Sequence, residues 1–229
     1  MISGLLYFME LKSPVRYCLF DLDNTLYDAS SPMLKRINIL ITRYIMDMFD
    51  ISFQQAQTLR REAFHTYGTT LRWLKKEHGF RDEDHYLDYI HPKDVHWWVE
   101  QHEDIRGILS SVPVSMSILT NSAREHAERV LGHFGVLDCF EKIYDIRFNN
   151  HISKPDRRAY IHVLEDLGLP TEEVLFIDDN PAFAEAFKEL GGQGMVLDYL
   201  GIHEGYPGVY CRSLESCAAH IKRAAPTQP

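Results

Sequence analysis

The chain has 229 residues, of which 45% are hydrophobic and 25% charged, and its formal net charge is −9. These proportions are ordinary for a globular protein with a sizeable core, and the negative charge disfavours nucleic acid or an anionic membrane as a partner. Four scattered cysteines without C-x-x-C spacing are typical of a reducing compartment, so we expect a cytoplasmic protein without membrane association.

The first predicted element is a short buried strand over residues 15–20, because its residues are apolar on both faces. Asp21 and Asp23 follow this strand. If the extended backbone continues, the two carboxylates project to the same side and repel each other unless a cation or a shared proton separates them. A hard divalent ion, which takes oxygen ligands, suits such a site. The alternative is an ordinary turn at Asp23-Asn24.

A helical region without strand signals comes next. Apolar residues recur at three- and four-residue steps, and Ser31-Pro32 provides a helix cap and first turn. Helices are predicted over residues 31–48, 52–66, 69–78 and 82–90. We interpret the region as a small all-helical module inserted after the first strand.

The pattern then alternates between strand and helix. Strands are predicted over residues 114–120, 142–145, 174–177 and 194–197, and helices over residues 124–134, 155–167 and 182–190. Each of these helices ends at glycine. Such alternation predicts an α/β fold with a parallel sheet covered on both faces.

Three of the later strand ends also carry polar side chains. They are Thr120 with Asn121, then Lys154, and then the pair Asp178 and Asp179. Because ligands bind at the carboxyl edge of an open parallel sheet, we expect all these groups to converge on the first two aspartates.

This set of side chains suits phosphoryl transfer. Carboxylates hold magnesium, a hydroxyl and amide hydrogens at a helix start bind an anionic group, and a lysine neutralises both a carboxylate nucleophile and the phosphoryl group. An aspartate can itself attack phosphorus and form an acyl phosphate.

Each motif also has a plain structural explanation. Thr120-Asn121-Ser122 could be a helix cap, and Lys154 a solvated loop residue. Asp178-Asp179 could be a favourable helix start. All four motifs at sheet edges in this order are an improbable coincidence, so the catalytic interpretation is favoured.

The sequence Asp21-Leu22-Asp23-Asn24-Thr25, followed by Thr120, Lys154 and Asp178-Asp179, resembles the four-motif signature of the haloacid dehalogenase-like hydrolases. The resemblance implies a Rossmann-like core and identifies the helical insertion with the first type of cap domain in that superfamily. It implies that Asp21 is the nucleophile and Asp23 the general acid/base, which points to a phosphatase or phosphotransferase rather than a dehalogenase.

The resemblance also implies ligands and binding residues. Magnesium would be held by Asp21, the backbone carbonyl of Asp23, Asp179 and, directly or through water, Asp178. Thr120 and Asn121 would bind the phosphoryl oxygens, Lys154 would orient the nucleophile, and Thr25 would support the turn.

A closer likeness is to the pyrimidine 5′-nucleotidase branch. It rests on residues 23–27, residues 67–72 and residues 177–179. This likeness implies UMP or CMP as substrates and places Arg72 among the substrate-binding residues. We also consider that Trp73 or Tyr67 stacks on the substrate base.

We therefore expect a core formed by residues 1–27 and 106–222, a helical cap over 28–105 and a frayed tail over 223–229. The expected activity is magnesium-dependent hydrolysis of small phosphorylated metabolites through an aspartyl-phosphate, by a monomer or homodimer. Two alternatives remain: a phosphotransferase or phosphomutase acting on sugar phosphates, and a non-enzymatic phospho-acceptor switch.

Overall fold

The computed structural model describes residue 11, residues 14–100 and residues 104–226. In these residues a six-stranded parallel sheet has the order β3-β2-β1-β4-β5-β6. The strands are β1 (Tyr17–Phe20), β2 (Ser115–Leu119), β3 (Ile143–Tyr144), β4 (Val174–Asp178), β5 (Gln193–Leu197) and β6 (Val209–Cys211). Phe20 at the end of β1 is level with Ile118 of β2 and Ile177 of β4. The strand ends that carry the predicted motifs therefore lie side by side.

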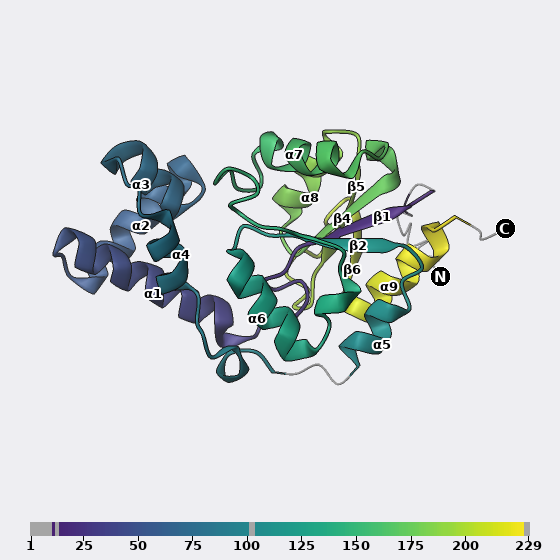
Figure 1. Ribbon diagram of the computed structural model, residues 1–229, viewed down its shortest axis with the longest axis horizontal. Coiled ribbons are helices and arrows are strands. Elements are labelled where there is room, and N and C mark those ends of the chain that lie inside the picture. The colour runs from purple at the N-terminus through teal and green to yellow at the C-terminus, as the bar shows by residue number, and fades with distance from the viewer. Residues whose placement is uncertain (1–10, 12–13, 101–103, 227–229) are drawn as a thin grey trace, which may run out of the picture.

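Helices cover both faces of the sheet (Figure 1). One face packs against α5 (Ile105–Ser110), α6 (Arg124–Phe134) and α9 (Leu214–Ala224), and the other against α7 (Arg157–Leu167) and α8 (Pro181–Lys188). Alternate residues of β1 serve the two faces, because Cys18 and Phe20 belong to the first core cluster and Tyr17 and Leu19 to the second. The apolar composition of β1 on both faces thus has a direct structural cause.

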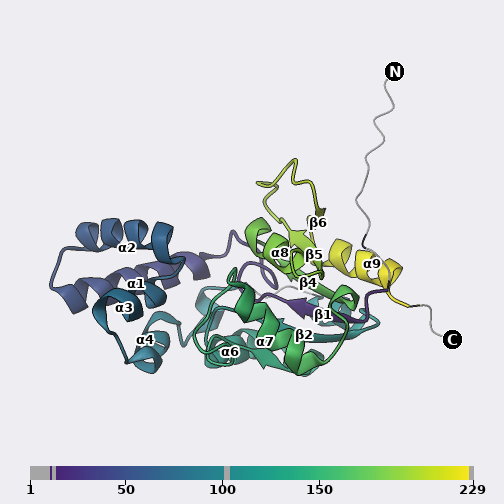
Figure 2. The same cartoon turned by 90° about the horizontal axis from the view of Figure 1, so that it is seen from above.

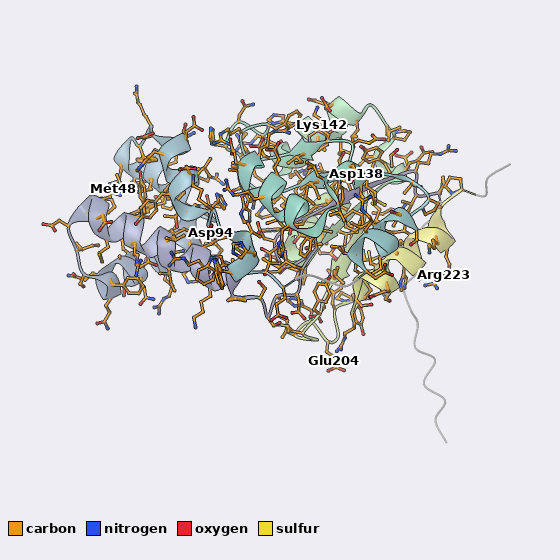
Figure 3. All side chains as sticks on the ribbon, turned by 60° about the horizontal axis from the view of Figure 1, so that its bottom comes forward. Met48, Asp94, Asp138, Lys142, Glu204 and Arg223 are labelled. Atoms are coloured by element: carbon orange, nitrogen blue, oxygen red, sulfur yellow. The ribbon has the colours of Figure 1, made fainter. Side chains whose placement is uncertain are left out.

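The helical insertion forms a separate lobe beside the sheet (Figures 1 and 2). It contains α1 (Pro32–Phe49), α2 (Phe53–Tyr67), α3 (Thr70–His78) and α4 (Glu83–Ile90), which share a hydrophobic cluster that includes Ile45 and Leu74. Met48 marks the outer end of this lobe, and Arg223 lies at the opposite end of the molecule (Figure 3).

No helix among the described residues has the length and apolarity needed to cross a membrane. The chain therefore has the expected α/β fold, a Rossmann-like parallel sheet with an all-helical insert.

Local sequence accounts for the helix ends in this insert. Ser31 caps α1 by accepting a hydrogen bond from the Met33 backbone, with proline as the first helical residue. Ser52 and Gln55 form a reciprocal capping box at the start of α2. Gly79 ends α3 with a φ of 60°, a left-handed conformation that glycine adopts without strain. The four predicted helices of the insert are confirmed to within one or two residues at each end.

The C-terminal part of the core differs from the sequence prediction. Helix α5 before β2, strand β6 and helix α9 were not predicted, and residues 223 and 224, at the start of the expected frayed tail, belong to α9. Helix α9 continues to Ala224, because the Ala224 carbonyl accepts a hydrogen bond of 2.9 Å from the Val15 backbone N–H. Residues 227–229 of the predicted tail lie outside the described residues.

Trp73 provides a test of the packing within the insert. Its side chain is 6% exposed, and its ring lies 5.7 Å from the Phe49 ring and 4.8 Å from the His78 ring. We expect Trp73→Ala to lower the free energy of unfolding by about 3–5 kcal/mol through lost packing, measured by urea denaturation. The matched control is Trp97→Ala, because the Trp97 side chain is 72% exposed and its loss should cost less than about 0.5 kcal/mol. Equal effects of the two substitutions would contradict this packing.

Candidate active site

The chain leaves the sheet immediately after Asp21. The Asp21 backbone N–H still donates to the Ile177 carbonyl at 2.8 Å, but the Leu26 N–H already donates to the Leu22 carbonyl at 3.0 Å. Asn24 adopts a φ of 64° within this turn. The turn at Asp23-Asn24, which was the alternative to a cation site, is therefore present. Both can exist together, because the turn begins after Asp21, whose backbone is still bonded to the sheet.

Lys154 connects the ends of three strands. Its Nζ donates to Asp21 Oδ1 at 2.6 Å, to Asp178 Oδ2 at 2.7 Å and to the Leu119 carbonyl at 2.9 Å. The lysine side chain is only 1% exposed. The interpretation of Lys154 as a solvated loop residue is therefore wrong. Burial alone would lower the pKa of Lys154, but its two carboxylate partners raise it and keep the ammonium charged.

Asn121 holds the backbone of Lys154. The Asn121 Oδ1 accepts a hydrogen bond of 2.8 Å from the Lys154 N–H, and its Nδ2 donates to the Lys154 carbonyl at 3.2 Å. This pair of bonds ties the segment after β2 to the loop before α7. The Asn121 side chain therefore positions the lysine, an effect that the sequence analysis did not foresee.

Thr25 connects the two acidic segments. Its hydroxyl donates to Asp21 Oδ2 at 3.1 Å and accepts from the Asp179 backbone N–H at 3.1 Å. Asn24 adds a contact of 3.4 Å from its Nδ2 to Asp179 Oδ2. The predicted support of the turn by Thr25 thus extends to the neighbouring strand end.

Three carboxylates form a candidate metal site. One oxygen from each of Asp21, Asp178 and Asp179 lies within 4.8 Å of the others. Burial raises the pKa of Asp21 and Asp178 above the usual range. Burial and the nearby Asp21 carboxylate raise the pKa of Asp179 to about 7. Since one lysine cannot balance three clustered carboxylates, and since all the donors are oxygens, the group fits a hard divalent ion such as Mg²⁺.

The Asp23 carboxylate is not part of that acidic group. Its Oδ1 accepts hydrogen bonds from the Tyr27 hydroxyl at 2.5 Å and from His126 Nε2 at 2.8 Å, and its Oδ2 accepts one from the Ser122 hydroxyl at 2.6 Å. Burial would raise the pKa of Asp23, but attraction to His126 and the three donors together lower it. The two aspartates after β1 therefore have different hydrogen-bond partners, but their charges still interact, because the Asp23 carboxylate helps to raise the pKa of Asp21. A metal contact from Asp23 would come from its backbone carbonyl and stays a prediction.

The sequence analysis missed all three donors to Asp23. The available signals were the position of Tyr27 four residues after Asp23 in the same turn, and the position of His126 one helical turn beyond Ser122. Such signals indicate proximity only when the fold is known.

Other predicted residues lie at different distances from this centre. Thr120 is 2% exposed, and its hydroxyl accepts a hydrogen bond of 3.0 Å from the Ser122 N–H. Arg72 lies on α3 in the insert, with Nη1 3.9 Å from Asp156 Oδ2. It lines a cavity of about 230 Å³ together with the loop before α7, and it does not contact the acidic cluster.

A second cavity, of about 290 Å³, lies between the insert and the core. The core contributes polar residues, among them Asn121, Ser122 and Ser153. All four helices of the insert contribute the opposite wall, which combines aliphatic side chains with Asn38, Arg60 and Thr70. Trp73 and Tyr67 are not among the lining residues. Trp73 is in the core of the insert, and the Tyr67 hydroxyl donates to Glu77 at 2.6 Å. The hypothesis that one of these rings stacks on a substrate base is therefore not supported.

Comparison with known proteins establishes the family. Residues 15–191 match the family model of the haloacid dehalogenase-like hydrolases, which is well over half of the chain. The chain belongs to this family of hydrolases, as the motifs predicted. Similarity to the pyrimidine 5′-nucleotidase branch is not part of this match.

Individual relatives agree with this assignment. The chain is 35% identical over 82 residues to enolase-phosphatase E1 from Parvibaculum lavamentivorans (strain DS-1), and the match spans about a third, 34%, of each chain. The HAD phosphatase from Thermococcus onnurineus has a similar structure, with a TM-score of 0.65 and 17% identity over 92% of this chain and 99% of that one.

Further solved structures share the fold. The HAD-hydrolase YfnB from Bacillus subtilis, a structure bound to magnesium, gives a TM-score of 0.63 at 17% identity over 91% of this chain and 99% of the other. The L-2-haloacid dehalogenase from Xanthobacter autotrophicus gives 0.59 at 18% identity over 92% and 100%. At these identities the likeness concerns the fold alone, because the neighbours include both phosphatases and dehalogenases.

The acidic cluster predicts how metal affinity depends on pH. The pKa of Asp179 is near 7 in the folded protein and about 3.8 when unfolded, so its neutral form stabilises the metal-free protein below about pH 4. That contribution is lost as the pH rises through about 7. Mg²⁺ must displace the proton, so the increase in Tm caused by Mg²⁺ should grow from about pH 5.5 to about pH 8.

Thermal unfolding with Mg²⁺ or with EDTA measures this dependence. Asp179→Asn should show little Mg²⁺ effect at any pH, whereas Asp47→Asn, which changes an exposed carboxylate of α1, should behave like the unmodified protein. A Mg²⁺ effect that does not vary with pH, or that persists in Asp179→Asn, would contradict the proposed ligand set.

Proposed function

We propose that the protein is a magnesium-dependent phosphatase that hydrolyses small phosphomonoesters through an aspartyl-phosphate at Asp21. The observation that carries this proposal is the buried Lys154 ammonium, which contacts Asp21 and Asp178 beside a third carboxylate. A fixed cation at a nucleophilic carboxylate stabilises the charge that develops during phosphoryl transfer. The phosphatases among the similar proteins add support to this choice of reaction.

The first chemical step forms a bond between an Asp21 carboxylate oxygen and phosphorus and breaks the bond from phosphorus to the leaving oxygen. The Lys154 ammonium and the Thr25 hydroxyl hold the two Asp21 oxygens and keep the carboxylate oriented. The Thr120 hydroxyl and the Asn121 backbone N–H bind the phosphoryl oxygens before the start of α6. A bound Mg²⁺ would neutralise phosphoryl charge and align the reacting groups.

Asp23 supplies and removes the proton. Its three donors favour the carboxylate, which takes a proton from the water that attacks the phosphorus of the aspartyl-phosphate. In the first step the same group, in its minor protonated form, gives a proton to the leaving oxygen. The second step regenerates the Asp21 carboxylate and releases inorganic phosphate. The hydrogen-bond partners of Asp23 support its role as acid/base rather than nucleophile, because its carboxylate contacts neither Lys154 nor the acidic cluster.

The helical insert within residues 28–105 acts as a cap in this proposal, and the sheet unit built from residues 1–27 and 106–222 acts as the catalytic core. Support comes from the cavity of about 290 Å³, whose wall combines residues of the insert with Asn121 and Ser122 of the core. The organic part of a substrate would bind there while the phosphoryl group reaches Asp21. Closure would exclude bulk water during the transfer.

The proposed substrates are pyrimidine nucleoside 5′-monophosphates such as UMP and CMP. The apolar part of the cavity lining, which includes Ile37, Ile41, Leu71 and Ile90, suits the faces of a flat base, and Asn38 and Arg60 supply polar groups. Arg72 would contribute only from the edge, since it lines the smaller neighbouring cavity.

Replacement of the nucleophile tests the mechanism. Asp21→Asn removes the nucleophilic carboxylate but keeps its size, so kcat for p-nitrophenyl phosphate should fall by about 10⁴-fold or more while the circular dichroism spectrum is unchanged. Asp47→Asn is the matched control and should keep full activity. Substantial turnover by Asp21→Asn would rule out the aspartyl-phosphate route.

A screen of phosphorylated metabolites with Mg²⁺ or with EDTA tests the substrate class. We expect kcat/KM for UMP and CMP to exceed the values for AMP, GMP and hexose phosphates by about tenfold or more, because the cavity has to match the leaving group. All activity should be lost with EDTA. A preference for hexose phosphates with transfer to a second hydroxyl of the sugar would instead establish the phosphomutase alternative.

A further inference from the structure

The aspartate proposed as acid/base is held by a histidine from outside the four sequence motifs. His126 lies in the first turns of α6 and its side chain is completely buried. Its Nε2 is 2.8 Å from Asp23 Oδ1, and since a carboxylate can only accept, Nε2 carries the hydrogen. Among the described residues, His126 Nδ1 has no hydrogen-bond partner. The contact with Asp23 is therefore the hydrogen bond that orients this ring.

A second histidine, from the helical insert, packs against the first. His91 follows α4 directly, and its ring stacks on that of His126 with a centroid distance of 4.5 Å and an interplanar angle of 23°. His91 is 3% exposed, and its Nδ1 donates to the Leu87 carbonyl at 2.7 Å. The His91 ring is thus fixed by its own helix and in turn restricts the tilt of the His126 ring.

We propose that His126 is a positioning residue for Asp23, and that His91 supports it from the insert. The inference rests on the proposed function, since it concerns the acid/base step of that reaction. Tyr27 and Ser122 alone would leave the carboxylate with one donor on each oxygen. The third donor, from a rigid buried ring, sets the angle at which Asp23 meets the leaving oxygen, and proton transfer requires that geometry.

Leaving-group dependence separates this role from a general effect on folding. A good leaving group departs without a proton, whereas a poor one needs the acid. The test compares kcat/KM values for a series of substituted phenyl phosphates. This quantity reports the steps up to phosphoryl transfer. For His126→Leu we expect a loss of about 30-fold with phenyl phosphate and of less than about threefold with 2,4-dinitrophenyl phosphate.

Two polar variants provide a matched pair. His126→Gln can place an amide N–H where Nε2 lies and should retain activity within about threefold on all substrates. His126→Asn is one methylene shorter, cannot reach Asp23 and should resemble His126→Leu. His91→Phe keeps the stacked ring and should be nearly unchanged, whereas His91→Leu should show the same selective loss to a smaller degree.

The controls keep the result interpretable. His220→Leu changes a partly buried histidine of α9 that bonds only within its own helix among the described contacts, and it should have no selective effect. Inhibition by orthovanadate and the Tm report whether the phosphoryl site and the fold are intact in each variant. An equal loss with all leaving groups, or no loss in His126→Leu and His126→Asn, would overturn the proposal for His126. Failure of the proposed function would show itself differently, as activity retained in Asp21→Asn or no phosphatase activity in the unmodified protein.

Discussion

The site depends on one buried ammonium group placed between two carboxylates. Asp21 and Asp178 come from neighbouring strands, and without Lys154 they would face each other with little solvent to screen their repulsion. The parallel pairing of β1 with β4 brings the acids together, and the loop before α7 brings the cation. The arrangement still has excess negative charge because Asp179 lies beside it. The same sheet edge thus holds a fixed cation and three carboxylates that could bind a metal ion.

The sequence predicted most of this centre because its motifs lie directly at strand ends. Asp21, Thr120 and Asp178 follow apolar runs, and the rule that parallel strands present their carboxyl ends at one edge was enough to group them. Lys154 was predicted only through the complete set of motifs, since a loop lysine has no local pattern of its own. The ranges of the insert helices were predictable from their caps and glycine ends.

Contacts that cross between elements could not be predicted in this way. The donors to Asp23 come from a turn, a loop and α6, and their convergence depends on how α6 packs on the sheet. Trp73 shows the opposite error, because an aromatic residue beside a recognition-like segment was considered for binding but is used for packing. The short strand β6 and helix α9 were missed because their apolar patterns are brief and are interpretable only beside the rest of the sheet.

The side chain of Asn121 has a consequence for how this architecture can diversify. By holding both the N–H and the carbonyl of Lys154, the Asn121 side chain links the loop after β2 to the loop before α7 at the edge of the sheet. Both of these loops belong to the core, so the helical insert can change at positions other than His91 without removing this link.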